Sequence, residues 1–128
     1  MRGPILFLTL LAVSSCGMLS GKPSIPEALQ GRWGINEADC EPGRSDAKGL
    51  MEVGEETLTF YESRAVLSEA ALRSDSMIEG AFAFTGEGMS WSKVMRLRVS
   101  DGGNRLIRDD MTGDEAPMTL IYGRCGRT

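Results

Sequence analysis

The side chains that could do chemistry in this chain are few. Its 128 residues include three cysteines, Cys16, Cys40 and Cys125, and no histidine. Histidine is the commonest general base and metal ligand near neutral pH, so its absence removes the usual means of activating a nucleophile or holding a metal. Thiols remain, and an odd number of them indicates that one cysteine differs in role from the other two.

Serine nucleophiles lack a suitable base. Ser90, Ser92 and Lys93 lie together, but Ser92 and Lys93 are adjacent on a predicted strand, where neighbouring side chains point to opposite faces. Residues 109–115 hold four carboxylates that could bind calcium, although they lack the Asp-x-Asp-x-Asp-Gly pattern, so a solvated acidic turn is favoured. We therefore expect no catalytic residue, no metal and no cofactor.

The first fifteen residues have the form of a secretion signal. Arg2 precedes a nine-residue apolar run at 5–13. A membrane-spanning helix needs about 20 apolar residues, so this run is too short to cross a bilayer and has the proportions of a signal peptide. We expect residues 1–15 to be that signal peptide.

The residues that follow resemble the lipobox of bacterial lipoproteins. Val13, two serines and Cys16 give that family's order of an aliphatic residue, two small residues and the modified cysteine. The resemblance implies cleavage before Cys16, a diacylglycerol on its thiol and a fatty acid such as palmitate on the new amino group. Each buried methylene contributes about 0.8 kcal/mol, so several acyl chains anchor a protein firmly. The alternative is an ordinary leader cut after Ser14, with Cys16 left as a spare thiol.

Residues 16–27 are expected to form the lipidated cysteine and a flexible tether. Residues 17–27 contain two prolines, two glycines and two serines. In the lipoproteins that the chain resembles, Asp after the modified cysteine retains the protein in the inner membrane. Gly17 is not Asp, which favours the outer membrane, with the domain facing the periplasm.

The charge balance limits the class of partner. The chain has 14 basic and 18 acidic residues, a net charge of −4, and without Arg2 the balance is 13 against 18, or −5. A nucleic-acid partner would require a basic stripe, so none is expected. An acidic surface permits attraction to a cationic protein, although it is also an ordinary solvated surface.

Residues 28–128 are predicted to form one all-β domain. Strands are expected at 31–36, 50–53, 57–61, 64–72, 77–85, 89–99, 105–111 and 118–125. Apolar and polar side chains alternate within several of them, and the Asp-Gly-Gly-Asn at 101–104 is a strong hairpin signal. About eight short strands joined by tight turns favour a small antiparallel up-and-down barrel, with a two-sheet β-sandwich as the alternative.

Two segments of this domain have helix-forming composition. Residues 69–73 are compatible with a short helix as well as a strand. Residues 26–30 are compatible with one helical turn, with Ser24 as its cap.

Cys40 and Cys125 are expected to form a disulfide. The leader implies an oxidising compartment, and lipidation of Cys16 leaves an even pair. In an eight-stranded meander, however, Cys125 ends the last strand beside the start of the first, whereas Cys40 lies beyond the end of the first. The bond therefore requires residues 37–49 to fold back along the barrel, or a strand count that is wrong by one.

Gly31 and Trp33 open the first strand, and Arg124 lies near the end of the last. This resembles the calycin pattern of lipocalins and their relatives, in which a Gly-x-Trp opens the first strand and a late arginine packs across the indole. Such a contact contributes about 0.5–2 kcal/mol. A Gly-x-Trp followed by a cysteine is similar also to the small periplasmic inhibitors of secreted metalloproteases, which are eight-stranded barrels. Both resemblances imply that Trp33 plugs one barrel end.

Residues 60–64 are the strongest candidate for a contact patch. Tyr61, Glu62 and Arg64 combine an aromatic side chain with two charges, and tyrosine and arginine are enriched at binding hot spots. Glu62 and Arg64 are expected to share a face, on which they could pair across a rim. The alternative is that Phe60 belongs to the core and the rest is ordinary strand surface.

Together these observations predict a lipid-anchored, non-enzymatic binding module with a protein partner in the envelope. Inhibition of a hydrolase, such as a protease or lysozyme, is its most concrete form. Burial of Cys16 in the membrane counts against inhibition through a free N-terminal arm. The alternatives are a structural accessory of an envelope assembly and a carrier of a small apolar ligand. Six methionines in the domain can fill a barrel interior adaptably, which disfavours the carrier.

Overall fold

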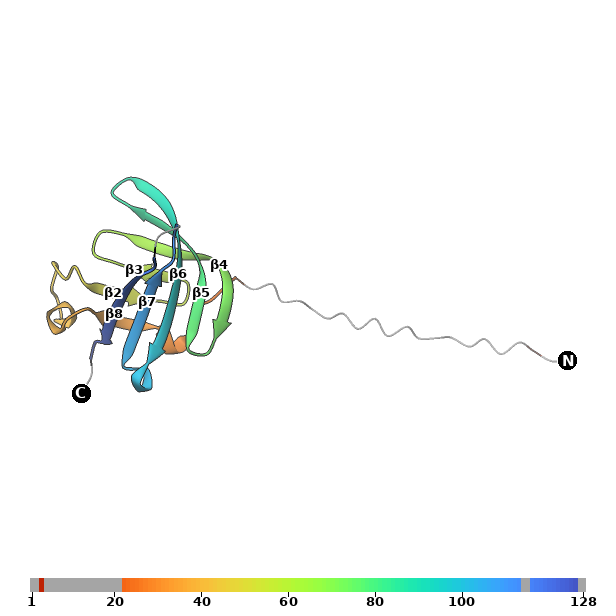
Figure 1. Ribbon diagram of the computed structural model, residues 1–128, viewed down its shortest axis with the longest axis horizontal. Helices are drawn as coiled ribbons and strands as arrows, with labels where there is room; N and C mark the ends of the chain where they lie inside the picture. Colours follow the sequence, from red (N-terminus) through yellow and green to blue (C-terminus); the bar gives the residue numbers. More distant parts are fainter. Residues whose placement is uncertain (1–2, 4–21, 114–115, 127–128) are drawn as a thin grey trace.

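The computed structural model describes residue 3, residues 22–113 and residues 116–126. Apart from residue 3, the predicted signal peptide, Cys16 and the first part of the tether lie outside these ranges. The described chain is all-β, and its eight antiparallel strands follow one another around a closed barrel (Figure 1). The strands are β1 (Gly31–Gly34), β2 (Leu50–Val53), β3 (Thr57–Thr59), β4 (Arg64–Ser74), β5 (Met77–Gly86), β6 (Met89–Ser100), β7 (Arg105–Asp110) and β8 (Met118–Arg124). The predicted up-and-down barrel is confirmed, and the sandwich is excluded because β8 pairs with β1.

Three short 3₁₀ helices accompany the strands: η1 (Glu27–Leu29), η2 (Glu37–Cys40) and η3 (Asp101–Gly103). The helical turn predicted at 26–30 is present as η1. Ser24 does not cap it, because the N-cap residue of η1 is Pro26, which gives no side-chain hydrogen bond. The Ser24 carbonyl instead accepts a hydrogen bond from Arg73 Nε at 3.0 Å. Residues 69–73 belong to β4, where pairing with β5 continues past two register shifts.

Two strands end two residues earlier than predicted, for local reasons. β1 ends at Gly34 because Asn36 is the N-cap residue of η2, where its side chain and that of Asp39 form a reciprocal capping box. β3 ends at Thr59 because the Phe60 N–H donates to the Ser63 carbonyl at 2.8 Å and closes a turn. Backbone hydrogen bonds satisfied within a turn cannot extend a strand.

The barrel interior is filled with side chains. The fully buried ones on the strands include Trp33, Met51, Leu58, Ile78, Phe82, Met95, Leu97 and Leu106. Of the six methionines expected to fill the interior, Met51 and Met95 do so completely, whereas Met89 and Met118 are 61% and 58% exposed. Interiors packed in this way leave little space for a ligand.

One barrel end is covered by residues that were assigned to the tether. Ile25 is 1% exposed, and its N–H donates to the Glu55 carbonyl at 2.7 Å. Pro26 and Leu29 are also buried there. The folded domain therefore starts before residue 28, because burying Ile25 removes apolar surface from water despite the surrounding prolines. We call this the η1 end, and the opposite end, which carries turns 60–63 and 86–88 and the segment after Asp110, the rim.

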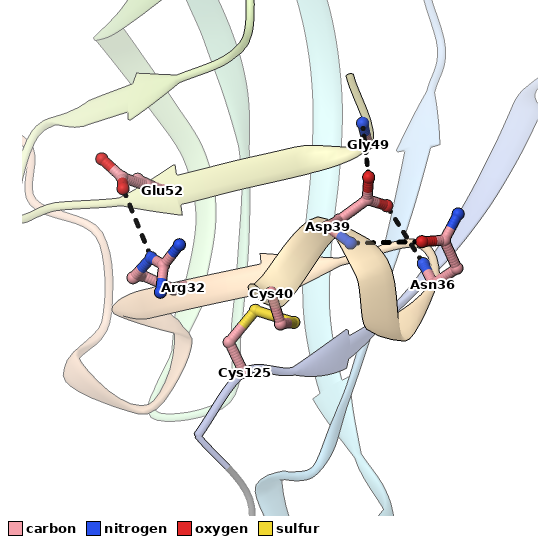
Figure 2. Close-up of a disulfide and its surroundings, with 7 residues drawn as sticks. All are labelled: Arg32, Asn36, Asp39, Cys40, Gly49, Glu52 and Cys125. Carbon is pink, nitrogen blue, oxygen red and sulfur yellow. Dashed lines mark hydrogen bonds and ion pairs between the residues drawn. A yellow bond between two sulfur atoms is a disulfide. The ribbon is translucent and has the colours of Figure 1, made fainter. Parts of the chain in front are cut away.

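The predicted Cys40–Cys125 disulfide is present, with Cα atoms 5.2 Å apart (Figure 2). The strand count of eight is correct, and the disulfide forms because residues 37–49 fold back along the barrel. β1 is only four residues long, and η2 returns over it, so that a Cβ added to Gly34 would lie 2.9 Å from Cys40 Sγ. The disulfide indicates a location outside the reducing cytoplasm.

The returning loop is fixed by Asp39, which is 7% exposed. Its carboxylate accepts hydrogen bonds from the Asn36 N–H at 3.1 Å and the Gly49 N–H at 3.2 Å, as Figure 2 shows. These bonds join the two ends of the loop that carries Cys40.

Candidate functional site

At the η1 end, the structure brings together the three residues of the Gly-x-Trp and arginine pattern. Arg124 is the register partner of Trp33, and its guanidinium carbon lies 4.1 Å from the indole centre. The buried Trp33 donates from Nε1 to the Leu29 carbonyl at 2.8 Å. Gly31 has φ +127°, and a Cβ there would lie 3.0 Å from Arg124 Nη1, so a side chain would crowd the guanidinium. This arrangement plugs the barrel, as the sequence implied.

At the rim, a second arginine covers an aromatic ring. Arg108 Cζ lies 4.9 Å from the Phe60 ring centre. Phe60 stacks on Phe84 at 5.7 Å, and Phe84 stacks on Trp91 at 5.5 Å. Arg108 Nη1 donates to the Tyr122 hydroxyl at 3.1 Å. Both ends of the barrel are thus closed by a cation over an aromatic face.

Sequence reasoning missed this rim cluster, which we define as Phe60, Phe84, Trp91 and Arg108. The available signal was the alternation on β7, where Arg108 shares the inward face with Leu106. An inward-facing arginine is unusual because burying its charge is costly unless it is paired.

Among the ion pairs of the described residues, the least exposed is that of Lys93 with Asp110 at the rim, at 2.7 Å. Burial acts to raise the pKa of Asp110, but hydrogen bonds from Lys93 and from the backbone and hydroxyl of Thr112 outweigh it and hold that pKa below its ordinary value. Lys93 points inward to this pair, whereas the neighbouring Ser92 is exposed, which separates them as predicted.

The acidic turn does not gather its carboxylates where the chain is described. Asp109 accepts a hydrogen bond from the Thr119 hydroxyl at 2.6 Å, and Asp110 is held by Lys93. In residues 22–113 and 116–126, no three His, Cys, Asp or Glu side chains are grouped to hold a metal ion. The turn's other two carboxylates, Asp114 and Glu115, lie outside the described residues.

The predicted contact patch is exposed beside two shallow grooves. Tyr61 is 44% exposed, and Glu62 and Arg64 are exposed too. Tyr61 borders one groove of about 190 Å³, which extends to Arg44, and another of about 300 Å³, which extends to Lys48. The ion pairs found among the described residues do not include a Glu62–Arg64 pair. Glu62 lies within turn 60–63, whereas Arg64 is the first residue of β4. Phe60 packs against the core, as the alternative interpretation had it.

Comparison of the chain with known protein families, curated proteins and solved structures finds no match. Within the described ranges, none of the helices has the length and apolar character needed to cross a membrane.

Proposed function

We propose that this protein is an envelope lipoprotein, anchored through Cys16, that acts as a non-enzymatic binding module through the outer surface of a small calycin-like barrel. The observation that carries this proposal is the closure of the barrel at both ends, by Arg124 over Trp33 and by Arg108 over Phe60. A filled and doubly plugged barrel disfavours the carrier of an apolar ligand, because the ligand would have to displace packed side chains.

Tyr61, with Glu62 and Arg64 beside it, is the contact surface that we assign to this function. An exposed tyrosine next to grooves offers a large amphipathic side chain at low entropy cost, as at many protein interfaces. The lipobox resemblance supports the anchor, and the disulfide supports export. The outer membrane, facing the periplasm, is the favoured location because Gly17 is not Asp.

A cationic hydrolase is the partner class that the net charge favours. The N-terminal arm is a poor protease plug, because Ile25 is buried on the barrel and Ser24 is held by Arg73. This leaves lysozyme-like enzymes as a better candidate than proteases within the inhibitor class. A structural accessory of an envelope assembly would use the same surface.

Two experiments test the proposal. Labelling with radioactive palmitate should mark the wild-type chain and not Cys16→Ser, and flotation with membranes should be lost in the same variant. Capture from detergent-solubilised envelopes should retain a stoichiometric protein with the wild-type chain and lose most of it with Tyr61→Ala. Palmitate on Cys16→Ser would contradict the anchor, and a small ligand retained by purified protein would contradict surface binding. Inhibition of lysozyme and of metalloproteases at micromolar protein tests the partner class.

A further inference from the structure

β8 is paired over its whole length on one side only. Toward β7, the register runs from Arg105 opposite Gly123 to Asp110 opposite Met118. Toward β1, it contains two pairs, Trp33 with Arg124 and Gly34 with Gly123. β1 then stops, so the first residues of β8 have no neighbouring strand on that side.

The backbone groups that face this gap can be assigned from the hydrogen bonds at the end of β8. The Arg124 N–H donates to Asn104 on the β7 side, and the Cys125 N–H donates to Arg32 on the β1 side. Successive residues of a strand direct their N–H and C=O groups to alternate sides. Thr119 and Ile121 therefore direct theirs toward the gap.

The segment after β1 does not reach these groups. The Asn36 N–H, which would come next in the ladder opposite Ile121, donates instead to Asp39 Oδ2 at 3.1 Å (Figure 2). Within the described part of the chain, the ladder and the remaining hydrogen bonds give the backbone groups of Thr119 and Ile121 no partner on this side. Two donors and two acceptors are thus left in strand geometry, which is a template for one more strand.

Apolar side chains border the same gap. Ile121 is 54% exposed, Met118 58% and Ile35 49%. A groove of about 400 Å³ lies at its base, lined by Gly34, Asn36 and Gly123 among others. An added strand would cover this surface and continue into the groove.

Arg108 gives the gap a chemical preference. It is the register partner of Leu120, and its guanidinium lies between the Tyr122 hydroxyl and the Phe60 ring, on the inner side of the gap. Its Nε is buried without a hydrogen-bond partner, and the ion pairs among the described residues do not include it. A partly desolvated guanidinium without a counter-ion is suited to bind a carboxylate.

We propose that the β8 edge binds an extended peptide segment of a protein partner by strand addition, with an Asp or Glu side chain of that segment directed at Arg108. Two antiparallel backbone pairs form, at Thr119 and at Ile121, and the side chain of the segment that lies opposite Leu120 is on the same side of the sheet as Arg108. The proposal rests on the proposed function in requiring a protein partner. It assigns a binding mode and an acidic preference, set by Arg108, that the net charge of the chain does not predict.

Amide hydrogen exchange tests the open edge directly, using the mature lipidated chain in detergent micelles. Thr119 and Ile121 should exchange within about tenfold of the rate of an unstructured chain, and the intervening Leu120, whose N–H faces β7, at least a hundredfold more slowly. Equal protection of all three amides would overturn the proposal, because the edge would then already be paired.

Selection from a phage library of random dodecapeptides tests the ligand. Enriched peptides should share one acidic residue, and Thr119→Pro should weaken their binding at least tenfold, since it removes the edge N–H. Proline is tolerated on an edge whose N–H faces solvent. Thr119→Ala is the matched control, because it also loses the hydroxyl bonded to Asp109 but keeps the N–H, and it should bind within twofold of wild type. Arg108→Gln should weaken binding of the acidic peptides at least tenfold.

Three results would overturn the proposal: no enrichment, enriched peptides that bind Thr119→Pro as well as wild type, or a concentration-dependent dimer that protects Thr119 and Ile121. The dimer would show that a second copy of this chain covers the edge. If Thr119→Pro fails to fold, amide exchange in the wild-type chain replaces it as the test. Peptide addition should then slow the exchange of Thr119 and Ile121, and unchanged exchange would overturn the proposal. If Thr119→Pro still captures the envelope protein, the proposed binding module stands and only the proposal of strand addition at the β8 edge is refuted.

Discussion

Arg124 and Trp33 are partners across the seam between β8 and β1, and the arginine lies over the indole at 4.1 Å. The same guanidinium donates to the carbonyls of Gly103 at 2.8 Å, Ala28 at 2.8 Å and Gln30 at 3.1 Å. One side chain near the end of β8 therefore holds η1, η3 and β1 together. Because β1 and β8 share only two register pairs, this contact and the disulfide carry much of the closure.

Replacing Arg124 by methionine should destabilise the domain. The variant keeps apolar bulk over Trp33 but loses three charge-assisted hydrogen bonds and the cation, so we expect the free energy of unfolding to fall by about 2–4 kcal/mol. Urea denaturation followed by tryptophan fluorescence measures this. Arg105→Met, at an exposed arginine, is the control and should change stability by less than about 0.5 kcal/mol. Equal decreases in the free energy of unfolding of the two variants would show that the contacts of Arg124 with Trp33 and the three carbonyls do not stabilise the domain.

The disulfide should contribute strongly to stability, because it closes a loop of 85 residues. Changing Cys40 and Cys125 together to serine should lower the free energy of unfolding by about 4–5 kcal/mol in the chain-entropy model. Cys16→Ser should leave it unchanged. Thiol titration of unfolded Cys16→Ser without reductant should detect no free thiol, and detection of two would refute the bond.

Gly80 lies on β5 opposite a register shift in β4. A Cβ at this position would collide with the Glu69 backbone carbonyl, whereas a Cβ at Gly123, on β8, would meet nothing within 4 Å. Gly80→Ala should therefore lower the free energy of unfolding by about 1–3 kcal/mol, because backbone must move. Gly123→Ala should be neutral or slightly stabilising, since alanine restricts the unfolded chain. Thermal unfolding of the two variants tests both expectations. A Gly80→Ala variant as stable as wild type would contradict the close approach of Gly80 to the Glu69 carbonyl.

Asp110 should make the stability of the rim depend on pH. Its folded-state pKa lies below the ordinary value, so its contribution is complete above the unfolded-state pKa and is lost as the pH falls through the folded-state pKa. Stability should therefore decrease below about pH 4. Asp110→Asn should flatten part of that decrease, whereas Asp75→Asn, at an exposed turn, should not. If the stability of Asp110→Asn fell below about pH 4 as steeply as that of the wild-type chain, the contribution of Asp110 would be ruled out.

The strand order followed from the sequence because each strand has one buried face and ends at a turn with its own chemistry. On β6, Met95 and Leu97 are buried, whereas Arg96 between them is half-buried and Arg98 after them is exposed. This is the alternation that a half-buried strand requires. The Gly-x-Trp corner was predictable because closing a meander must bring Trp33 and Arg124 together.

The remaining features depend on contacts between distant segments. Ile25 lies among prolines and a serine that indicate a tether, and only its burial beneath the barrel reveals it as core. The length of β1 is set by the capping box of Asn36 and Asp39, which competes with strand continuation. Arg108 was missed because a charged residue in a strand is ordinarily assigned to the solvent face.

Site-specific photo-crosslinking in cells that make the lipidated chain tests the central claim most directly. The photoreactive residue is placed at Tyr61, on the rim, and in a control at Asp75, in the turn at the η1 end. We expect one dominant envelope-protein adduct from position 61 that is absent from position 75. The absence of any protein adduct from position 61, or the same adducts from both positions, would contradict a binding module that acts through this surface.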